Sequence, residues 1–501
     1  METKEQKYKE IIRVNLKNTL GSGFIPALGE HKKGKVRDVH FFTRNKEENI
    51  KEEYIIMTAS DRVSCFDHIL NNLIPFKGAI LNKFNEWAMS NTTDIVPNAM
   101  IQSPDPNVII QRKLSNVGFE CVVRGYVWGS LAADYEKGLR EKCGISLPEE
   151  LLRYQKLNEP LFTPSTKADQ GHDEDVSLEQ MEEKMGELAS KIKNISITLF
   201  RRAEELAAAR GLLFLDTKYE FGINSNDIYA REPYLIDESN TPDSSRYCSE
   251  DEYNTKMPQI VEAMKSGEYK NVNELLKKRP ELKIKEESKQ FVRDVLIEGG
   301  YIEGKPLPTL TDEQVIETSW RYINTYEKVT GMEFDFVKSE LSPKYRIINN
   351  LIKAGYLKYP GCIVPIGASD KDAAHWQKIL DAMKILDVLN GEELPFTDVV
   401  YMSAHKQTQE VLNYVKYMDE NSIQPLVYIT FAGRSNGLGP VVAGNTKYPV
   451  ITCPVFSDLD SYSIDIHSSL RMPGKLPLAT VVDPGNAVLL AKRILEMGKI
   501  E

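Results

Sequence analysis

The run Cys362-Ile-Val-Pro-Ile366, followed by Gly367-Ala-Ser-Asp370, decides the fold of the C-terminal part of the chain. Five apolar residues that end in small and polar ones are typical of a buried strand that opens into a loop. Similar runs follow, and we expect further strands at 398–402, 426–431, 450–453 and 478–482, with helices at 373–389, 407–418 and from 487. Strands that alternate with helices at this spacing predict an α/β domain with a doubly wound parallel sheet.

The loops after these strands carry the residues that indicate chemistry. In a flavodoxin- or Rossmann-like sheet, ligands bind beyond the carboxyl ends of the strands. Ser403-Ala-His-Lys406 follows the second strand, and Gly433-Arg-Ser-Asn-Gly437 follows the third. Small and hydroxyl residues let backbone N–H groups approach an anion, and a histidine can transfer a proton. These loops predict a site for a small anionic substrate, although ordinary βα turns also need Gly and Ser.

The earlier part of the chain has a different rhythm. Short β-rich runs alternate with Pro- and Gly-marked loops, which is typical of an α+β domain. Ser177 and Gln180 form a capping box at the start of a long predicted helix that ends at Gly211. We predict a first domain at 1–335, a linker at 336–358 that contains Ser342-Pro343, and a second domain at 359–501.

Composition limits the classes of function. The 501 residues carry 63 Lys and Arg against 73 Asp and Glu, a net charge of −10, which lacks the basic footprint of a nucleic-acid-binding protein. No run approaches the roughly 18 apolar residues that span a bilayer. The charged start has no apolar signal segment, and the six cysteines form no C-x-x-C pair. We therefore expect a cytoplasmic protein that binds neither nucleic acid nor membrane.

Two groups of residues in the first domain suit phosphates. His31-Lys-Lys-Gly34-Lys35-Val-Arg37 places cations around one glycine, although a short basic run is often only a solvated surface. Asp216, Lys218 and Glu220 alternate in Asp216-Thr-Lys-Tyr-Glu220 and would project from one face of a strand. Carboxylates beside a lysine suit Mg²⁺ and nucleotide phosphates, and a surface ladder of ion pairs is the alternative.

Longer motifs in the C-terminal domain resemble the aminoimidazole ribonucleotide (AIR) carboxylase family. They are Ser403-Ala-His-Lys406, Ala432-Gly-Arg-Ser-Asn-Gly-Leu-Gly-Pro440, Gly444-Asn-Thr-Lys-Tyr-Pro-Val-Ile-Thr-Cys-Pro454 and Ser468-Ser-Leu-Arg-Met-Pro473. The resemblance is to the animal-type branch, which takes CO2 directly, and implies carboxylation at imidazole C4 without biotin, metal or ATP.

The resemblance also implies roles for residues of this domain. His405 would shuttle the C4 proton. The ribotide would be held by Ser369, Asp372, Ser403 and Lys406, and CO2 would be sheltered by the backbone of Gly433, Arg434, Ser435, Asn436 and Gly437. One loop departs from the family pattern, because Ala368 stands where the family has glycine and Lys371 follows. Alanine would restrict the backbone there if a positive φ were required.

The N-terminal motifs are similar to SAICAR (phosphoribosylaminoimidazole-succinocarboxamide) synthetase, in order from about 20 to 335. Besides the two phosphate-type runs, they are Ser60-Asp-Arg-Val-Ser-Cys-Phe-Asp67, Ile74-Pro-Phe-Lys-Gly78, Val122-Val-Arg-Gly-Tyr-Val-Trp-Gly-Ser130 and Phe162-Thr-Pro-Ser-Thr-Lys167. The resemblance implies a two-lobed α+β fold with ATP in the cleft. It also implies the reaction, in which ATP activates an imidazole carboxylate and the amine of L-aspartate attacks it.

The same resemblance assigns the residues of the synthetase site. ATP would be bound by Gly34, Lys35, Arg37 and Lys218, and Mg²⁺ by Glu220 and Asp237. Arg124, Ser130 and Arg246 would bind the ribotide phosphate, and Asp216 would accept from the imidazole amine, so that Asp216 and Lys218 are the catalytic candidates. Ser60, Asp61 and Arg62 would line the substrate cleft. Gly171-His-Asp-Glu174 is predicted to be a loop that closes on substrate.

These expectations combine into a bifunctional enzyme of purine biosynthesis, which acts on AIR, CO2, L-aspartate and ATP. The resemblance further implies a homo-octamer built on the carboxylase domain. Two alternatives stay open. In one, only the ligase is active and the C-terminal domain is an oligomerisation scaffold. In the other, the chain is a non-catalytic nucleotide sensor.

Overall fold

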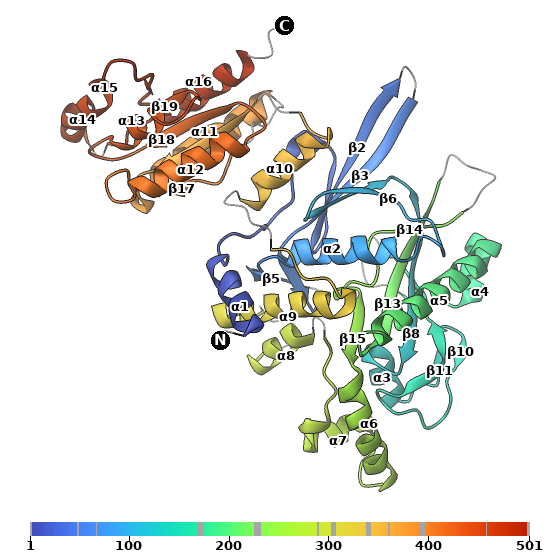
Figure 1. The fold of residues 1–501 in the computed structure, drawn as a ribbon. Coiled ribbons are helices and arrows are strands. Elements are labelled where there is room, and N and C mark those ends of the chain that lie inside the picture. The colour runs from blue at the N-terminus through green and yellow to red at the C-terminus, as the bar shows by residue number, and fades with distance from the viewer. Residues whose placement is uncertain are drawn as a thin grey trace. The chain divides into compact units, whose positions relative to one another are not determined.

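The computed structural model describes residues 3–47, 50–66, 68–167, 174–224, 232–287, 290–301, 307–336, 342–358, 361–390, 396–456 and 458–497. The chain forms two compact units, which are described separately (Figure 1). The first consists of Met1–Gly23 with Lys32–Phe336, and the second of Phe24–His31 with Val337–Glu501. The predicted closing loop at 171–174 lies almost entirely outside the described residues.

The N-terminal unit is built on two larger sheets. One has the order β1 (His31–Lys33), β2 (Arg37–Glu47), β3 (Ile50–Ala59), β7 (Val108–Arg112), β6 (Met100–Asp105). The other has the order β11 (Lys156–Phe162), β8 (Ser115–Tyr126), β13 (Leu212–Ile223), β14 (Tyr234–Ile236), with β12 (Ser165–Thr166) and β15 (Ser245–Ser249) paired at its sides. Two hairpin pairs stand apart, β4 (Arg62–Cys65) with β5 (His68–Leu73) and β9 (Glu141–Lys142) with β10 (Ile145–Ser146).

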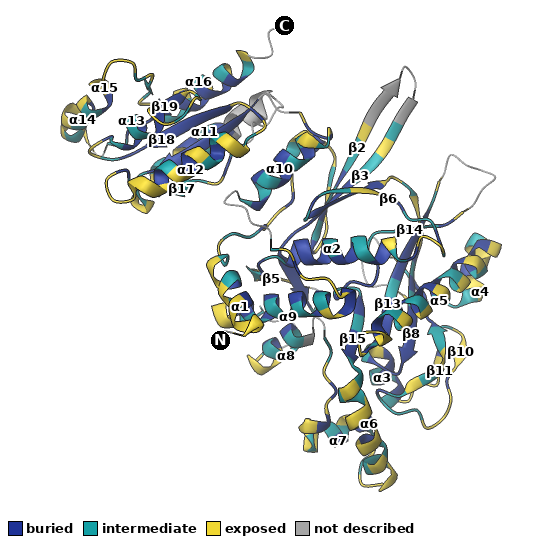
Figure 2. Ribbon diagram, viewed as in Figure 1, coloured by how far each residue is buried: buried dark blue, intermediate teal, exposed yellow. Residues whose placement is uncertain are grey.

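Helices cover these sheets and fill the space around them. They are α1 (Lys4–Val14), α2 (Lys77–Ser90), α3 (Gly129–Glu136), α4 (Leu178–Met185), α5 (Glu187–Ala208), α6 (Glu250–Lys265), α7 (Val272–Lys278), α8 (Gln290–Glu298) and α9 (Asp312–Thr330), with a short 3₁₀ turn at Pro280–Leu282. The 3₁₀ turn at Pro26–Leu28 belongs to the second unit. Helix α2 is buried along most of its length (Figure 2). The combination of antiparallel sheets and separate helices agrees with the predicted α+β class.

The packing of α5 on the second sheet separates two faces of strand β13. Tyr219 and Phe221 belong to the same apolar cluster as Leu199 and Phe200 of α5. Because successive strand residues point to opposite faces, Asp216, Lys218 and Glu220 lie on the face away from α5. The core thereby decides which face can bind ligands.

One predicted helix is two in the structure. The capping box at Ser177 is present, but α4 ends at Gly186, whose φ of 63° is left-handed, and α5 begins immediately afterwards. Glycine adopts this backbone conformation without the steric cost that a Cβ would bring. The expectation of a single uninterrupted helix was therefore wrong at one residue.

The C-terminal unit confirms the predicted parallel sheet. Its order is β17 (Val400–Tyr401), β16 (Cys362–Gly367), β18 (Leu426–Phe431), β19 (Val450–Thr452), β20 (Ala479–Thr480), and every described pairing is parallel. Its helices are α10 (Pro343–Lys353), α11 (Ala373–Asn390), α12 (Thr408–Asn421), α13 (Leu438–Ala443), α14 (Leu459–Asp465), α15 (His467–Leu470) and α16 (Pro484–Glu496), with a 3₁₀ turn at Asp370–Asp372. Strands β16 and β18 are buried throughout, and adjacent β16 residues such as Ile363 and Val364 enter separate apolar clusters.

Helix α10 occupies much of the segment predicted to be a linker. It begins after the capping residue Ser342. Its Tyr345 is 1% exposed, belongs to an apolar cluster of the C-terminal unit, and places its hydroxyl 3.0 Å from Ser422 Oγ. The segment 343–353 is thus part of a folded unit, whereas the exact domain boundaries stay a prediction.

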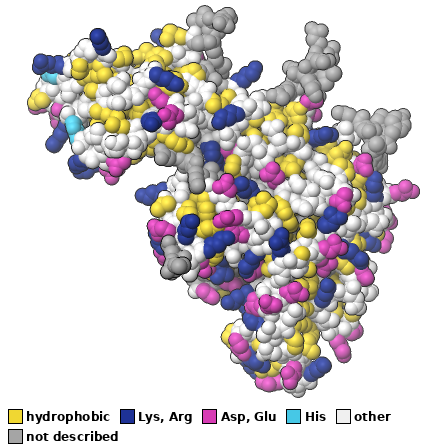
Figure 3. Space-filling model, in the orientation of Figure 1, with side chains coloured by type: hydrophobic (Ala, Val, Ile, Leu, Met, Phe, Trp, Pro, Cys, Tyr) yellow, Lys and Arg dark blue, Asp and Glu magenta, His cyan; other side chains and the backbone are white. Residues whose placement is uncertain are grey.

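Charges of both signs are interspersed over the face drawn in Figure 3. Among the described residues, no helix combines the length and apolarity needed to cross a membrane.

Tyr345→Ala tests whether α10 stabilises the C-terminal unit. We expect a loss of about 3–5 kcal/mol, because a large buried aromatic side chain is removed. Hydrogen exchange of the full chain, followed by mass spectrometry, should show faster exchange in β16 and β18 and unchanged exchange in β8 and β13. Lys353→Ala, at an exposed position of the same helix, is the control. Unchanged protection in β16 and β18 would contradict the assignment.

Candidate active sites

The charged residues of β13 lie beside residues of its neighbouring strand β8. The antiparallel register pairs Asp216 with Arg124, Lys218 with Val122 and Glu220 with Glu120. Asp216 also pairs with Arg246 of β15 on the other side. The prediction that Asp216, Lys218 and Glu220 share one face is confirmed by this register.

Glu220 lies at the centre of a buried polar cluster. It accepts from Lys167, from Lys218 Nζ at 2.9 Å and from Asn116 Nδ2 at 3.0 Å, and Lys218 also contacts Glu120 at 2.6 Å. Burial alone would raise the pKa of Glu220, but the charges of Lys218 and Lys167 outweigh burial and lower it. Glu220 is therefore an anion at neutral pH, surrounded by cations.

Asp237 and Glu238 form a second acidic group close to the first. Asp237 has a left-handed φ of 60°, and its carbonyl accepts from Asn85 Nδ2 and Gln111 Nε2, both at 3.0 Å. Burial and the charge of Glu220 raise the pKa of Asp237. Glu238 is bound by Arg37 at 2.6 Å, and this charge outweighs burial and lowers the pKa of Glu238.

The donor set of Glu220 and Asp237 fits a hard cation. The two carboxyl groups interact unfavourably, and a cation between them would remove this repulsion. The described residues contain no cluster of three or more His, Cys, Asp or Glu side chains suited to a metal. Mg²⁺ commonly uses one or two carboxylates and completes its shell with phosphate oxygens and water.

Ser60 and Arg62 form hydrogen bonds to the backbone of the Gly34 turn, and Asp61 binds neighbouring backbone. Arg62 donates to the carbonyls of Lys35 and Gly34 at 3.2 and 3.1 Å, and Ser60 Oγ donates to the Val36 carbonyl at 2.5 Å. Asp61 accepts from the backbone N–H groups of Leu20 and Gly78. All three residues are buried. Their contacts in the structure hold the backbone that carries Lys35, and a direct substrate contact stays a prediction.

Gly34 itself requires the absence of a side chain. Its N–H donates to the Arg37 carbonyl at 2.8 Å, and a Cβ would lie 2.7 Å from that oxygen. Lys35 is exposed at this turn, and Arg37 points to Glu238. The structure therefore connects the Gly34 turn to the Asp237–Glu238 group.

Two arginines converge on Asp216. Arg246 Nη1 lies 2.5 Å and Arg124 Nη1 3.6 Å from Asp216 Oδ2, and Arg124 also donates to Thr163 Oγ1 at 3.0 Å. The carboxylate raises the pKa of Arg246, whereas burial lowers that of Arg124. Gly129 packs on the Arg246 guanidinium, and Ser130 follows at the start of α3.

A cavity of about 90 Å³ adjoins this group. Asp243, Ser244 and Arg293 line it together with Asp216 and Arg246. Its lining carries the two arginines Arg246 and Arg293 and three carboxylates, those of Asp216, Asp243 and Glu286, so the cavity itself has no excess of cations.

Sequence reasoning missed several residues of this unit. Glu120, Asn116, Lys167 and Arg293 were assigned no role, and neither was the buried Lys77, which donates to Asp243 at 2.7 Å beside Tyr322. Lys77 and Lys167 stand inside the quoted motifs, so those motifs were the available signal. The others depend on pairing between distant segments.

In the C-terminal unit, the loops after β16, β17 and β18 meet at one edge of the sheet. A Cβ on Gly437 would lie 2.9 Å from the His405 imidazole, and one on Gly433 would lie 3.8 Å from Asp372 Oδ1. Burial raises the pKa of Asp372. His405 is exposed, so its ring can meet a substrate while it rests against the Gly437 backbone.

Asn436 holds the third loop in place. Its Nδ2 donates to Thr452 Oγ1 at 2.9 Å and Ser469 Oγ at 3.0 Å, and its Oδ1 accepts from the Gly439 N–H at 3.2 Å. The side chain is 3% exposed. Its contacts are structural, so a direct role of the Asn436 side chain in binding substrate has no support from them.

The remaining predicted residues lie in the same loops with local contacts. Ser369 Oγ accepts from the Lys371 N–H at 3.2 Å, and the Ser403 carbonyl accepts from the Lys406 N–H at 3.2 Å. Arg434 has a left-handed φ of 56° and is followed by Ser435. Ala368 is not among the described residues with positive φ, so alanine at this position costs no backbone strain.

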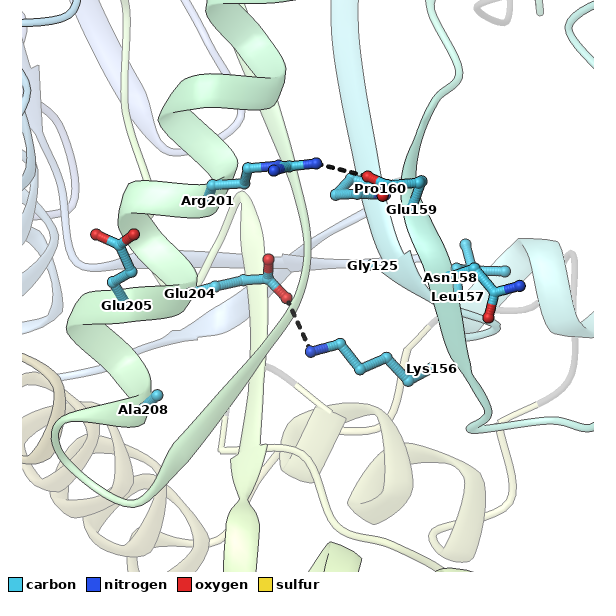
Figure 4. A pocket seen from close by; sticks show the side chains of 10 residues that line it. All are labelled: Gly125, Lys156, Leu157, Asn158, Glu159, Pro160, Arg201, Glu204, Glu205 and Ala208. Carbon is cyan, nitrogen blue, oxygen red and sulfur yellow. Dashed lines mark hydrogen bonds and ion pairs between the residues drawn. The ribbon is translucent and has the colours of Figure 1, made fainter.

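The groove in Figure 4 lies on the other face of the second sheet. A Cβ on Gly125 would touch the Phe200 ring of α5, whereas its neighbour Arg124 points to Asp216. Two ion pairs join α5 to β11 there, Arg201 with Glu159 at 2.5 Å and Lys156 with Glu204 at 3.7 Å. The groove is thus separate from the charged face of β13.

Each of the two units carries one candidate active site, and the two differ in their residues: charged carboxylates, lysines and arginines in the first, and a histidine beside glycine-rich loops in the second. Residues 30–264 match the family described as SAICAR synthetase, and residues 363–501 match AIR carboxylase.

Individual relatives agree with the first match. The chain is 41% identical over 328 residues to a phosphoribosylaminoimidazole-succinocarboxamide synthase of Cytophaga hutchinsonii, a match over 64% of this chain and 94% of that protein. It is 39% identical over 315 residues to the synthase of Bacteroides fragilis, over 62% and 89%. The solved SAICAR synthase from Saccharomyces cerevisiae in complex with SAICAR is 26% identical, with a TM-score of 0.50, 63% of this chain and 100% of that chain covered. The chain belongs to the SAICAR synthetase family and carries an AIR carboxylase domain after the synthetase domain.

Glu220→Gln tests the electrostatics of the central cluster. A carboxylate with a lowered pKa stabilises the fold above its ordinary pKa near 4.5 and loses this effect as the pH falls towards its folded pKa of about 2. We expect the variant to lose about 1–3 kcal/mol at pH 7. Urea unfolding between pH 3 and 7 should show the difference from the unmodified chain shrinking below pH 4.5. The exposed Glu159→Gln is the control, and a pH-independent difference would contradict the assignment.

Proposed function

We propose that this chain catalyses two consecutive steps of purine biosynthesis. The C-terminal unit carboxylates AIR with CO2, and the N-terminal unit joins the product to L-aspartate while ATP is hydrolysed to ADP and phosphate, which gives SAICAR. The observation that carries the ligase assignment is the single charged face on which Asp216, Lys218 and Glu220 meet Arg124 and Arg246. The two family matches support both activities.

The ribotide would bind at the arginine end of this face. Arg124, Arg246 and Ser130 would hold its 5′-phosphate, because guanidinium groups bind phosphate with paired hydrogen bonds. Asp216 orients Arg246 at 2.5 Å and would accept from the imidazole amine. The imidazole carboxylate would then point along β13 towards Lys218.

ATP would bind at the other end. The exposed Lys35 at the Gly34 turn, with Arg37 and Lys218, supplies cations for its phosphates. Glu220 and Asp237 would hold Mg²⁺, which when bound would neutralise phosphate charge during the transfer. Lys218 lies between the two ends and would neutralise the carboxylate as it approaches the γ-phosphate.

The chemistry needs positioning more than strong acid–base groups. A carboxylate oxygen of the ribotide attacks the γ-phosphate, and ADP leaves. The amine of aspartate then attacks the activated carbonyl, loses a proton, and expels phosphate as the amide forms. The fixed cations of the site stabilise the negative charge that develops in both steps.

In the C-terminal unit, His405 is the proposed proton carrier. C4 of the imidazole forms a bond to CO2, and the C4 proton passes to the His405 imidazole. The Gly433–Gly437 backbone would shelter CO2, and Asp372, Ser369, Ser403 and Lys406 would orient the ribotide. We propose no biotin and no metal for this step.

We further propose a cytoplasmic homo-octamer that assembles through the carboxylase unit. The measured mass of the full chain in solution tests this, and a mass of one chain or of two chains would contradict it. An inactive C-terminal scaffold is not favoured, because Ala368 is accommodated without positive φ.

Two substitutions should separate the activities. Glu220→Gln should abolish ATP-dependent ligation and leave carboxylation intact, and His405→Asn should do the reverse, so each variant is the control for the other. Carboxylation is measured with AIR and bicarbonate, and ligation is measured separately with the carboxylated ribotide, ATP and aspartate, each substrate being omitted in turn. Full ligation by Glu220→Gln would contradict the Mg²⁺ assignment. ATP binding without aspartate-dependent ADP release by the unmodified chain would favour a sensor.

Gly437→Ala should impair carboxylation specifically. The new Cβ would lie 2.9 Å from the His405 ring and force it to move, and a misplacement of about 1 Å costs about 100-fold in rate. Gly474→Ala, where a Cβ would meet nothing within 4 Å, is the matched control. Equal carboxylation rates for the two variants would show that His405 does not act from its observed position.

A further inference from the structure

A cavity of about 610 Å³ lies in the N-terminal unit away from the charged face of β13. It is bounded by the end of α3, by residues 149–153, and by α6 and α7. Figure 1 shows these elements together at one end of the unit. Its volume is within the range of about 300–1,000 Å³ that small-molecule sites occupy.

Part of the wall of this cavity is apolar, and the rest is formed by charged and polar side chains. Leu152, Val261, Met264 and Val272 pack with the apolar cluster around Met257, whereas Leu151 and Tyr135 belong to a separate cluster. The cavity lines the boundary between the two clusters. An apolar part of a ligand would therefore be removed from water here.

The charged groups of the cavity leave cations in excess. Arg153 binds Glu136 at 2.5 Å, and Arg140 lies 3.2 Å from Glu149. Lys265 and Lys270 also line the cavity, and neither forms an ion pair with a described carboxylate. Among the acidic residues of the lining, Glu150 alone forms no ion pair with a described residue. An anionic ligand group would be attracted to the lysines at the rim.

Helix α3 connects this cavity to the ribotide end of the ligase site. Tyr135 and Glu136 at its end line the cavity, and Glu136 also accepts from the Asn273 N–H of α7 at 3.3 Å. At its start, Gly129 packs on Arg246 so closely that a Cβ would lie 2.8 Å from Nη1. Helix α3 is about 12 Å long, so its two ends contact the cavity and Arg246 at the same time.

We propose that this cavity is a regulatory site for a small anion with an apolar body, and that its occupation changes ribotide binding through α3. Binding itself is independent of the proposed ligase function, whereas the effect on the ribotide rests on it. A ligand that pushes or fixes the end of α3 changes the position of Gly129 and hence of Arg246.

The binding is tested with 1-anilinonaphthalene-8-sulfonate (ANS), an apolar anion that fluoresces when it leaves water. The folded full chain is titrated, together with the double variant Lys265→Glu/Lys270→Glu and the control Lys277→Glu, which lies on α7 but does not line the cavity. We expect at least tenfold weaker ANS binding by the double variant and unchanged binding by the control. Equal affinity of all three proteins would overturn the site.

The coupling is tested by calorimetric titration of the carboxylated ribotide with and without saturating ANS. We expect its dissociation constant to change severalfold in the unmodified chain and not in the double variant, and ANS affinity to change by the same factor when ribotide is bound. ANS binding without any change in ribotide affinity would overturn the coupling. A chain that binds ribotide but does not ligate it would refute the proposed function and leave the coupling result valid.

Discussion

The antiparallel pairing of β13 with β8 is the constraint on which the ligase site depends. Tyr219 and Phe221 must face α5 for the core to close, and the alternate residues are then forced to the other side. A slip of one residue would place Glu220 under α5 and Tyr219 in solvent, at a large cost in both apolar burial and unpaired charge. The hydrophobic core therefore fixes the position of the charged face more firmly than the charges themselves do.

That face holds its charges in a balance that suits phosphate ligands. Lys218 and Lys167 already neutralise Glu220, and Arg37 neutralises Glu238, so the cations are fixed in place before a ligand arrives. Asp237 is the exception, because burial and Glu220 raise its pKa. A polar site with its partners preorganised needs little rearrangement when negative charge develops during a reaction.

The sequence predicted those features that local pattern determines. Period-two spacing placed Asp216, Lys218 and Glu220 on one face, and strand–helix alternation predicted the parallel sheet; the register and topology confirm both. Contacts between distant segments could not be predicted in this way. Arg37 meets Glu238 and Lys77 meets Asp243 only because separate sheets and α2 come together. The break at Gly186 was missed because the helical spacing of the apolar residues continues from α4 into α5. The two helices are separated by Gly186 alone, whose backbone is left-handed.

The two sites stand on separate sheets, each with its own apolar core. A substitution that destabilises one core therefore leaves the residues of the other core in contact, and each activity can be lost alone. The chemical reason to join the two activities does not require contact between the sites. Carboxylation of the imidazole is easily reversed, and ligation that consumes ATP removes its product. By mass action, removal of the product shifts the carboxylation equilibrium towards the carboxylated ribotide, whether or not that product is released into solution first. Because both sites are on one chain, they are present in equal numbers. The amount of ligase that consumes the carboxylated product therefore rises together with the amount of carboxylase that makes it.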